Sequence, residues 1–224
     1  MRKVFDKELL KLHNSILRMG SIVEKQINTC IQALVKKDEK LADEVIKNDD
    51  LVDDLEKEIE DECIVLIAKE QPLATDLRKI FTTLKIVTDL ERMADHAVDI
   101  AKIAKKIKDE EYVRPLIKIP RMAELVQNMI KESLDSYVNE NKEGAYKACT
   151  LDDEIDYIYK TAFKESIDTM LERKESINQL TQFLFVCKYL ERIADHATNI
   201  CEWTIYLITG EHIDLSLIHI SEPT

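Results

Sequence analysis

Apolar residues recur every three or four positions along most of this 224-residue chain, which is the spacing that lines one face of an α-helix. The first such stretch, at about 6–36, places apolar residues at 9, 12, 16, 19, 23, 27 and 31. Further stretches lie at about 41–68, 73–108, 120–141, 145–173 and 176–210. The pattern therefore predicts six long helices and an all-α fold.

Proline-containing segments mark where some of these helices end. Pro72, in KEQPLATD, cannot lie inside a helix and separates the second helix from the third. The segment KDEEYVRPLIKIPR contains Pro115 and Pro120 and is the best candidate for a boundary between two halves of three helices each. We predict a first three-helix repeat at 1–110, a linker at 111–120, a second three-helix repeat at 121–210 and a tail of uncertain origin at 211–224, to which we assign no function.

The last helix carries start and stop signals. Ser176 and Gln179 have the three-residue spacing of a capping box, in which each side chain binds the other's backbone N–H. Gly210 is placed to end the helix as a C-cap glycine. These signals set the predicted ends of the sixth helix.

A dodecamer is written twice, about one hundred residues apart. LERMADHAVDIA occupies 90–101 and LERIADHATNIC occupies 190–201, and eight of the twelve positions are identical. Both copies fall in the third predicted helix of their half. A period of this length indicates a duplicated domain rather than an array of short repeats.

Carboxylates in these segments form stripes along the helices. Residues four apart on a helix lie about 40° apart around its axis, so Glu91, Asp95 and Asp99 share one stripe. The apolar residues of the dodecamers lie on roughly the opposite side, so we expect the stripes to face away from the core of their own bundle. The corresponding acidic pairs elsewhere are Glu191 and Asp195, Asp49 and Asp53, and Asp152 and Asp156.

Two interpretations of the stripes remain open. Acidic residues on an exposed helix face are often only solvated, but like charges at i and i+4 cost about 0.2–0.5 kcal/mol per pair, and the arrangement occurs four times. Hard carboxylate oxygens on adjacent helices suit divalent or trivalent cations, which would relieve the repulsion. Oxygen-only ligation admits iron, manganese, magnesium, calcium or zinc. We interpret His96 and His196, which flank the stripes, as packing or hydrogen-bonding beside the helix interface.

Composition narrows the class of protein. The formal charge of −12 disfavours nucleic acid as a partner. No apolar run approaches the roughly 18 residues needed to span a bilayer, and the N-terminal MRKVFDKELLK has no apolar signal core, so we expect a cytoplasmic protein without membrane insertion. The five cysteines show no paired spacing and are interpreted as reduced, apolar helix residues.

Catalytic motifs are missing from the sequence. Ferritin-type di-iron bundles use Glu-x-x-His, whereas the repeats here read Glu-x-x-x-Asp-His. There is no Gly-rich phosphate loop, no His-Glu-x-x-His and no nucleophile elbow with a spaced triad. We therefore predict a protein that is not an enzyme, with a metal-dependent enzyme built on the carboxylates as the alternative.

Four segments resemble one known family. NDDLVDDLE, QPLATDLRKIFTTLKIVTDLERMADHAVDIA, LDDEIDYIY and LERIADHATNICE, followed by TGEH, are similar to the PhoU family, the accessory regulators of bacterial phosphate uptake. The resemblance covers about 1–214 and implies two tandem, similar three-helix bundles.

The resemblance also implies a function. Family members are expected to act in the cytoplasm as adaptors between the ATPase subunit of the Pst phosphate ABC transporter and a PhoR-type sensor histidine kinase, and to hold the phosphate-starvation response off. Homodimers are expected. A regulator of a different transporter, or a purely structural helical scaffold, is an alternative.

The resemblance further implies metal clusters on the acidic motifs, with iron the expected metal and zinc, manganese or magnesium the alternatives. A first cluster would use Asp49, Asp53, Glu91 and Asp95, with Asp99 as an extra ligand, and a second would use Asp152, Asp156, Glu191 and Asp195. Asn199 replaces the counterpart of Asp99, so the two sites are expected to differ in occupancy.

Overall fold

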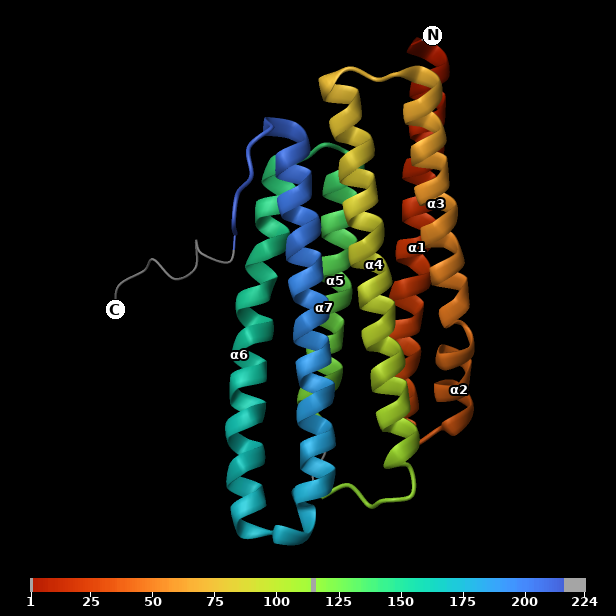
Figure 1. Ribbon diagram of the computed structural model, residues 1–224. Helices are drawn as coiled ribbons and strands as arrows, with labels where there is room; N and C mark the ends of the chain where they lie inside the picture. Colours follow the sequence, from red (N-terminus) through yellow and green to blue (C-terminus); the bar gives the residue numbers. More distant parts are fainter. Residues whose placement is uncertain (1, 114–115, 216–224) are drawn as a thin grey trace, which may run out of the picture.

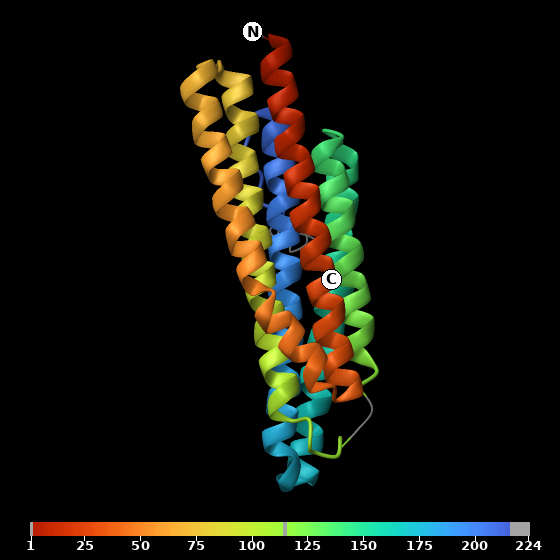
Figure 2. The same ribbon diagram turned by 90° about the vertical axis from the view of Figure 1, so that its right-hand side faces the viewer.

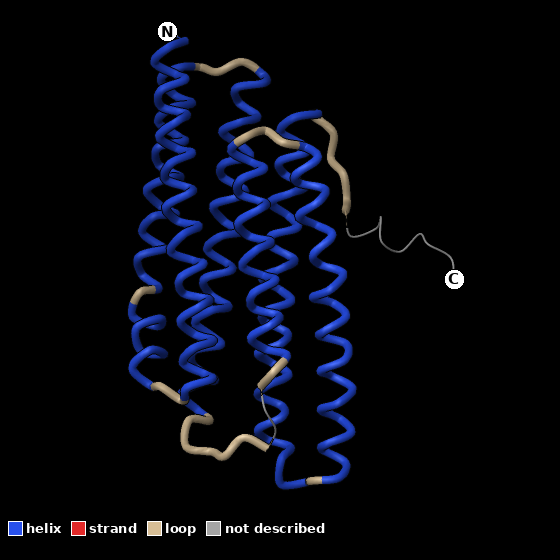
Figure 3. The backbone as a smooth tube through the Cα atoms, turned by 180° about the vertical axis from the view of Figure 1, so that it is seen from behind, coloured by secondary structure: helices blue, strands red, loops and turns tan. Residues whose placement is uncertain are grey.

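The computed structural model describes residues 2–113 and 116–215, and in this part of the chain helices are joined by short loops, without strands (Figure 3). The all-α prediction is therefore confirmed. The elements are α1 (Arg2–Lys36), α2 (Glu39–Lys47), α3 (Asp49–Glu70), α4 (Ala74–Lys106), α5 (Lys118–Val138), α6 (Lys142–Glu172), the 3₁₀ turn η1 (Lys174–Ser176) and α7 (Ile177–Thr209).

The helices form two bundles that lie side by side. The first contains α1 to α4 and the second α5 to α7, and all the long helices run nearly along one axis (Figures 1 and 2). α4 and α7 pack against each other in opposite directions at the centre, α1 also contacts α5, and α3 and α6 lie on the outer flanks. One continuous hydrophobic core runs through both bundles. The two copies of the dodecamer therefore meet at the middle of the molecule.

The second predicted helix is divided at Asn48, so the prediction of one continuous helix at 41–68 is wrong. The backbone of Asn48 leaves the helical conformation, with φ −88° and ψ 4°. Gln26 of α1 donates a hydrogen bond of 3.1 Å to the carbonyl oxygen of Asn48, which satisfies an acceptor at the break. The helical periodicity continues across this point, so the apolar pattern gives no sign of it.

The two ends of α7 differ in how well they were predicted. Gly210 ends the helix with φ 80°, and its N–H binds the carbonyl of Tyr206, as expected of a C-cap glycine. The predicted capping box is wrong. Ser176 donates to the carbonyl of Arg173 instead, and the Gln179 amide binds the segment that connects the bundles, accepting from Val113 N at 2.8 Å.

The buried residues include Tyr137 and all five cysteines. Tyr137 is fully buried, and its hydroxyl lies 2.7 Å from that of Thr83. All five cysteines are free and buried, as predicted. Within the described residues, none of the helices is both long and apolar enough to cross a membrane.

Candidate metal-binding seams

The first acidic cluster lies where α3 and α4 run side by side in opposite directions. Because the helices are antiparallel, the start of α3 lies beside the later turns of α4, and Asp49 and Asp53 come near Asp95. Partial burial raises the pKa of Asp49, and the charges of Asp53 and Asp95 raise it further. We call the group Asp49, Asp53, Glu56, Glu91 and Asp95 the first seam.

Glu91 is the most perturbed carboxyl group of the first seam. Its side chain is 16% exposed, and this burial, followed by the charge of Asp95, raises its pKa to about 7. Arg92 opposes the shift, because its guanidinium lies 3.3 Å from Glu91 and 3.2 Å from Asp95. The remaining repulsion comes from Glu56 and Asp53 across the seam. Two helices therefore contribute negative charge to one place.

The first seam extends along α3 beyond the pairs predicted as ligands. The pKa of Glu56 is raised by burial and by the charges of Glu60 and Asp53, and the Thr88 hydroxyl of α4 partly offsets the shift. At the other end, Asp99 lies one turn beyond Asp95 and forms an ion pair of 3.2 Å with Lys102. Asp99 is thus already partly neutralised.

The second acidic cluster lies between α6 and α7. Burial raises the pKa of Asp152 to about 6, with the next largest contributions from Asp195 and Asp156. The pKa of Asp195 is also raised to about 6. The largest cause is partial burial and the next is the negative charge of Glu191, although part of the Asp195 side chain is exposed to solvent. We call the group Asp152, Asp156, Glu191 and Asp195 the second seam.

Two lysines that the sequence analysis overlooked neutralise part of the second seam. Lys188 forms an ion pair with Glu191 and lies 5.7 Å from the centre of the Tyr159 ring. Lys160 binds Asp156 at 2.8 Å. Both pairs have i,i+3 or i,i+4 spacing, so the helical register contained the signal.

None of the nine predicted ligands lies in the hydrophobic core, in agreement with the expectation that the stripes face outward. Asp49 and Asp152 occupy equivalent places in the two seams. In each, the Oδ1 atom is buried and has no hydrogen-bond partner. A bound cation would satisfy these oxygens, and the all-oxygen donor set fits hard metal ions. Among the described residues, however, no three His, Cys, Asp or Glu side chains converge closely enough to hold a metal ion as they stand.

A polar cluster that is separate from both seams joins α4 to α7. His196 Nδ1 lies 2.8 Å from Asp89 Oδ1, and Asn199 donates to the same oxygen at 3.0 Å. On the other side, the His96 ring stacks on Tyr189 at 5.5 Å and lies 5.8 Å from the ring of His196. The prediction that both histidines lie at a helix interface is confirmed. No local pattern marks Asp89 as a functional residue, because its partners are more than one hundred residues away along the chain.

Known proteins share the arrangement in two bundles. A family model for the PhoU domain matches residues 16–104 and again 119–204, one match in each bundle. The chain belongs to the PhoU family. The PhoU crystal structure from Pseudomonas aeruginosa covers 92% of this chain and all of its own, with a TM-score of 0.88 and 36% identity. The match confirms two tandem three-helix bundles.

Relatives in the PhoU family also match along their full length. The phosphate-specific transport system accessory protein PhoU homolog of Clostridium acetobutylicum is 55% identical over 216 residues, which are 96% of this chain and 99% of that protein. The crystal structure of the phosphate transport system regulatory protein PhoU from Streptococcus pneumoniae has a TM-score of 0.88 and 33% identity, covering 94% of this chain and 99% of its own.

Proposed function

We propose that this PhoU-family chain is a cytoplasmic regulator of phosphate transport and of phosphate-starvation signalling. It acts as a non-enzymatic adaptor between the ATPase subunit of the Pst phosphate ABC transporter and a PhoR-type sensor histidine kinase. The observation that carries the proposal is the match to accessory proteins of phosphate-specific transport over 96% of the chain, including both repeats. Catalytic motifs are missing from the sequence, which agrees with an adaptor.

The regulatory role is tested by deleting the gene. Deletion should derepress phosphate-starvation genes in cells grown with abundant phosphate, and the intact gene should restore repression. Unchanged expression would contradict the proposal. A pull-down from phosphate-replete cells tests the partners, because recovery of the subunits of another transporter in place of the phosphate transporter would favour the alternative regulator.

We further propose that the seams bind metal ions. The first would be held by Asp49, Asp53, Glu91 and Asp95 with support from Asp99, and the second by Asp152, Asp156, Glu191 and Asp195. The buried Oδ1 atoms of Asp49 and Asp152, which have no hydrogen-bond partner, support this proposal. The ion would supply positive charge that the clustered carboxylates lack. Iron is the first expectation from the family resemblance. Elemental analysis of the purified protein tests it by comparing the iron content with the contents of zinc, manganese and magnesium.

The enzymatic alternative predicts a different result for the same preparation. A metal-loaded protein that hydrolysed a phosphate ester or reduced dioxygen with turnover would contradict the non-enzymatic proposal. The expected homodimer is a separate proposal, and light scattering of the purified chain would test it.

A further inference from the structure

Aromatic side chains gather on the surface where α4 begins and α7 ends. The two helices are antiparallel neighbours, so the first turns of α4 lie beside the last turns of α7 (Figure 1). The Phe81 ring of α4 packs edge-on against Trp203 and Tyr206 of α7, with ring centres 5.8 Å and 6.5 Å apart. The centres of the two α7 rings are 6.0 Å apart. The three rings therefore form one cluster across the contact between the bundles.

A ridge of side chains on α4 extends the ring cluster. Leu77, Phe81 and Lys85 are spaced by four residues, so they lie on one side of the helix, about one turn apart. Leu77 is 43% exposed and Phe81 is 41% exposed, and Lys85 is also exposed. Large apolar side chains that are adjacent and still in water mark an interaction surface. We call this surface the aromatic patch, and its residues are Leu77, Arg78, Phe81, Lys85, Trp203 and Tyr206.

Two cations border the rings of the aromatic patch. Lys85 Nζ lies 5.6 Å from the centre of the Phe81 ring and 5.6 Å from the centre of the Trp203 ring. The Arg78 guanidinium lies 5.5 Å from the centre of the Tyr206 ring. Contacts of this kind hold a cation beside an aromatic face and leave its positive charge in place. The patch therefore combines apolar rings with positive charge.

The positive charge of the patch is not matched by carboxylates. Among residues 2–113 and 116–215, no Asp or Glu forms an ion pair with Lys85 or Arg78. The Arg78 guanidinium donates to the Leu207 carbonyl at 3.4 Å, although a guanidinium has five N–H donors. It also lies directly over Gly210, where an added Cβ would come within 2.8 Å of it. Arg78 is thus held at the edge of the patch with donors to spare.

Acidic residues near Trp203 lie towards the C-terminal segment. Glu202 accepts a hydrogen bond of 2.7 Å from the backbone N–H of Leu215. Glu202 and Asp214 line a pocket with Trp203 and His212 that includes neither of the two cations. The negative charge therefore lies where α7 meets segment 211–215, and the positive charge lies on the α4 side of the rings.

The other end of the α4–α7 pair lacks the aromatic patch. The two dodecamers set an offset of 100 residues between α4 and α7. With this offset, Phe81, Lys85, Trp203 and Tyr206 correspond to Thr181, Phe185, Ile103 and Lys106. The two helices pack there without the three-ring cluster. The contact between α4 and α7 therefore does not by itself require the aromatic patch.

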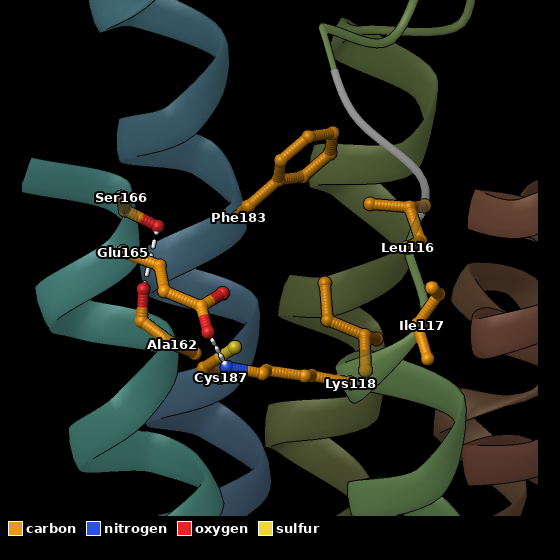
Figure 4. Close-up of a pocket in the computed structure, with 9 residues that line it drawn as sticks. Leu116, Ile117, Lys118, Ala162, Glu165, Ser166, Phe183 and Cys187 are labelled. Carbon is orange, nitrogen blue, oxygen red and sulfur yellow. Dashed lines mark hydrogen bonds and ion pairs between the residues drawn. The ribbon is translucent and has the colours of Figure 1, made fainter. Parts of the chain in front are cut away.

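The cavity between α5, α6 and α7 is enclosed by comparison. It has a volume of about 360 Å³, and the Lys118–Glu165 ion pair crosses it (Figure 4). Ala162, Phe183 and Cys187 in its lining are each no more than 5% exposed. Because this lining is already buried, covering it would remove little further apolar area from water. Docking on the aromatic patch would remove more.

We propose that the aromatic patch binds an amphipathic helix of another protein, and that the polar face of this helix is acidic. Apolar side chains at i and i+4 of the helix pack on Leu77 and Phe81, which have the same spacing. Its carboxylates pair with Lys85 and Arg78. Trp, Tyr and Arg are the residue types that most often dominate binding energy at protein interfaces. The inference rests on the proposed adaptor role, but binding to the purified chain needs neither transporter nor kinase.

Charge disfavours two other classes of occupant. The formal charge of −12 disfavours nucleic acid. Anionic membrane surfaces attract clusters of roughly 4–8 basic residues, whereas the cations of the patch are Arg78 and Lys85. Two cations in an acidic chain suit a short acidic segment of a protein better than an extended anionic surface.

The fluorescence of Trp203 tests the proposal, because Trp203 is the only tryptophan in the chain. The probe is a synthetic peptide of about 14 residues, or four turns, with leucines along one face, glutamates along the other and alanines between them. A lactam bridge holds it helical, and a second peptide has lysine in place of each glutamate. The glutamate peptide should change the Trp203 emission of the full-length protein saturably, with a dissociation constant below about 1 mM. The lysine peptide should leave the emission unchanged.

Protein variants locate the binding. Lys85→Glu reverses a charge at an exposed position and should weaken binding of the glutamate peptide by at least about ten-fold. Phe81→Ala should weaken it by about five-fold. The matched controls are Lys164→Glu on α6 and Phe185→Ala on α7, which change exposed side chains outside the patch and should bind as wild type. Circular dichroism checks that each variant is folded.

Three results with the peptides would overturn the proposal. The first is no change in Trp203 emission with the glutamate peptide up to about 1 mM. The second is an equal change with the lysine peptide. The third is equal binding of the glutamate peptide by Lys85→Glu and wild type.

Two further measurements identify a different occupant. Vesicles of phosphatidylglycerol and phosphatidylcholine should leave the Trp203 emission unchanged, and a blue shift that Lys85→Glu abolishes would assign the patch to a membrane contact. A dimer, measured by light scattering, that Lys85→Glu dissociates would assign the patch to an interface between copies. Either result would overturn the proposal. Its failure leaves the gene-deletion result unaffected, so the two proposals fail separately.

Discussion

The two seams share one helical scaffold but differ in how their negative charge is balanced. Along the first seam, Glu56 and Glu60 continue the acidic stripe and Thr88 faces them from α4. The second seam has Tyr159 and Phe163 at the matching turns of α6, and Lys188 at the position of Thr88. The duplication preserved the acidic pairs and changed the residues around them.

This difference determines how much charge each seam leaves unmatched. In the second seam, Lys188 binds Glu191 and Lys160 binds Asp156. In the first, five carboxylates cluster, and the single guanidinium of Arg92 is shared between Glu91 and Asp95. The first seam therefore has the greater need for a cation. We expect it to bind metal more tightly than the second.

The largest expected effect comes from removing the first-seam pair. Glu91→Ala with Asp95→Ala should weaken the tighter metal-binding event by about 100-fold or more, because both lost oxygens are charged ligands, while helicity stays intact. Isothermal titration with Mn²⁺ measures the affinity. The matched control is Glu191→Ala with Asp195→Ala, which should leave the tighter event in place. Loss of helicity in the first variant would contradict the outward placement of these side chains.

The next effect concerns the contact between the bundles. Asp89→Asn removes the charge that accepts from Asn199 and pairs with His196, and should lower the free energy of unfolding by about 1.5–3 kcal/mol. The matched control is Tyr189→Phe, at the equivalent position of α7. It should lower the free energy of unfolding by no more than about 0.5 kcal/mol. Urea unfolding measures both. Equal losses would show that the two sides of this interface are equivalent after all.

Lys188 of the second seam and Thr88 of the first occupy matching positions. Exchanging them should bring the metal affinities of the two seams closer together. Lys188→Thr gives the second seam the residue of the first and should strengthen its metal binding by about ten-fold, or 1.4 kcal/mol. The reciprocal Thr88→Lys should weaken the first seam by a similar factor. Titration with Mn²⁺ reads both variants. Unchanged affinities would mean that Lys188 does not limit metal binding by the second seam.

The smallest effect is a pH dependence of stability in metal-free protein. Folding raises the pKa of Glu91 from 4.5 to about 7, so the folded state holds this proton more tightly than the unfolded state, and its contribution is lost as pH rises through that window. Glu91→Gln should match wild type near pH 5 and be more stable at pH 8, by on the order of 1 kcal/mol after allowance for solvent screening. Thermal unfolding at both pH values tests the sign, and a variant less stable than wild type at pH 8 would contradict it.

The fold and the acidic stripes could be predicted because both depend on local periodicity. Apolar spacing located the long helices, and i,i+4 spacing identified Asp49, Glu91 and their partners. The break at Asn48 could not be predicted, since it depends on a hydrogen bond from Gln26, 22 residues away. Gln179 was misassigned because its amide binds the connecting segment rather than its own helix. Asp89 was overlooked because its interactions cross between bundles.

The central claim is that the seams bind cations and that the first binds more tightly. Anomalous diffraction from crystals of the full chain soaked in a limiting concentration of Mn²⁺ tests it most directly. The account predicts a peak between Asp49, Asp53, Glu91 and Asp95 that is stronger than any peak at the second seam. Absence of a peak at both seams, or a stronger peak between Asp152 and Asp195, would contradict it.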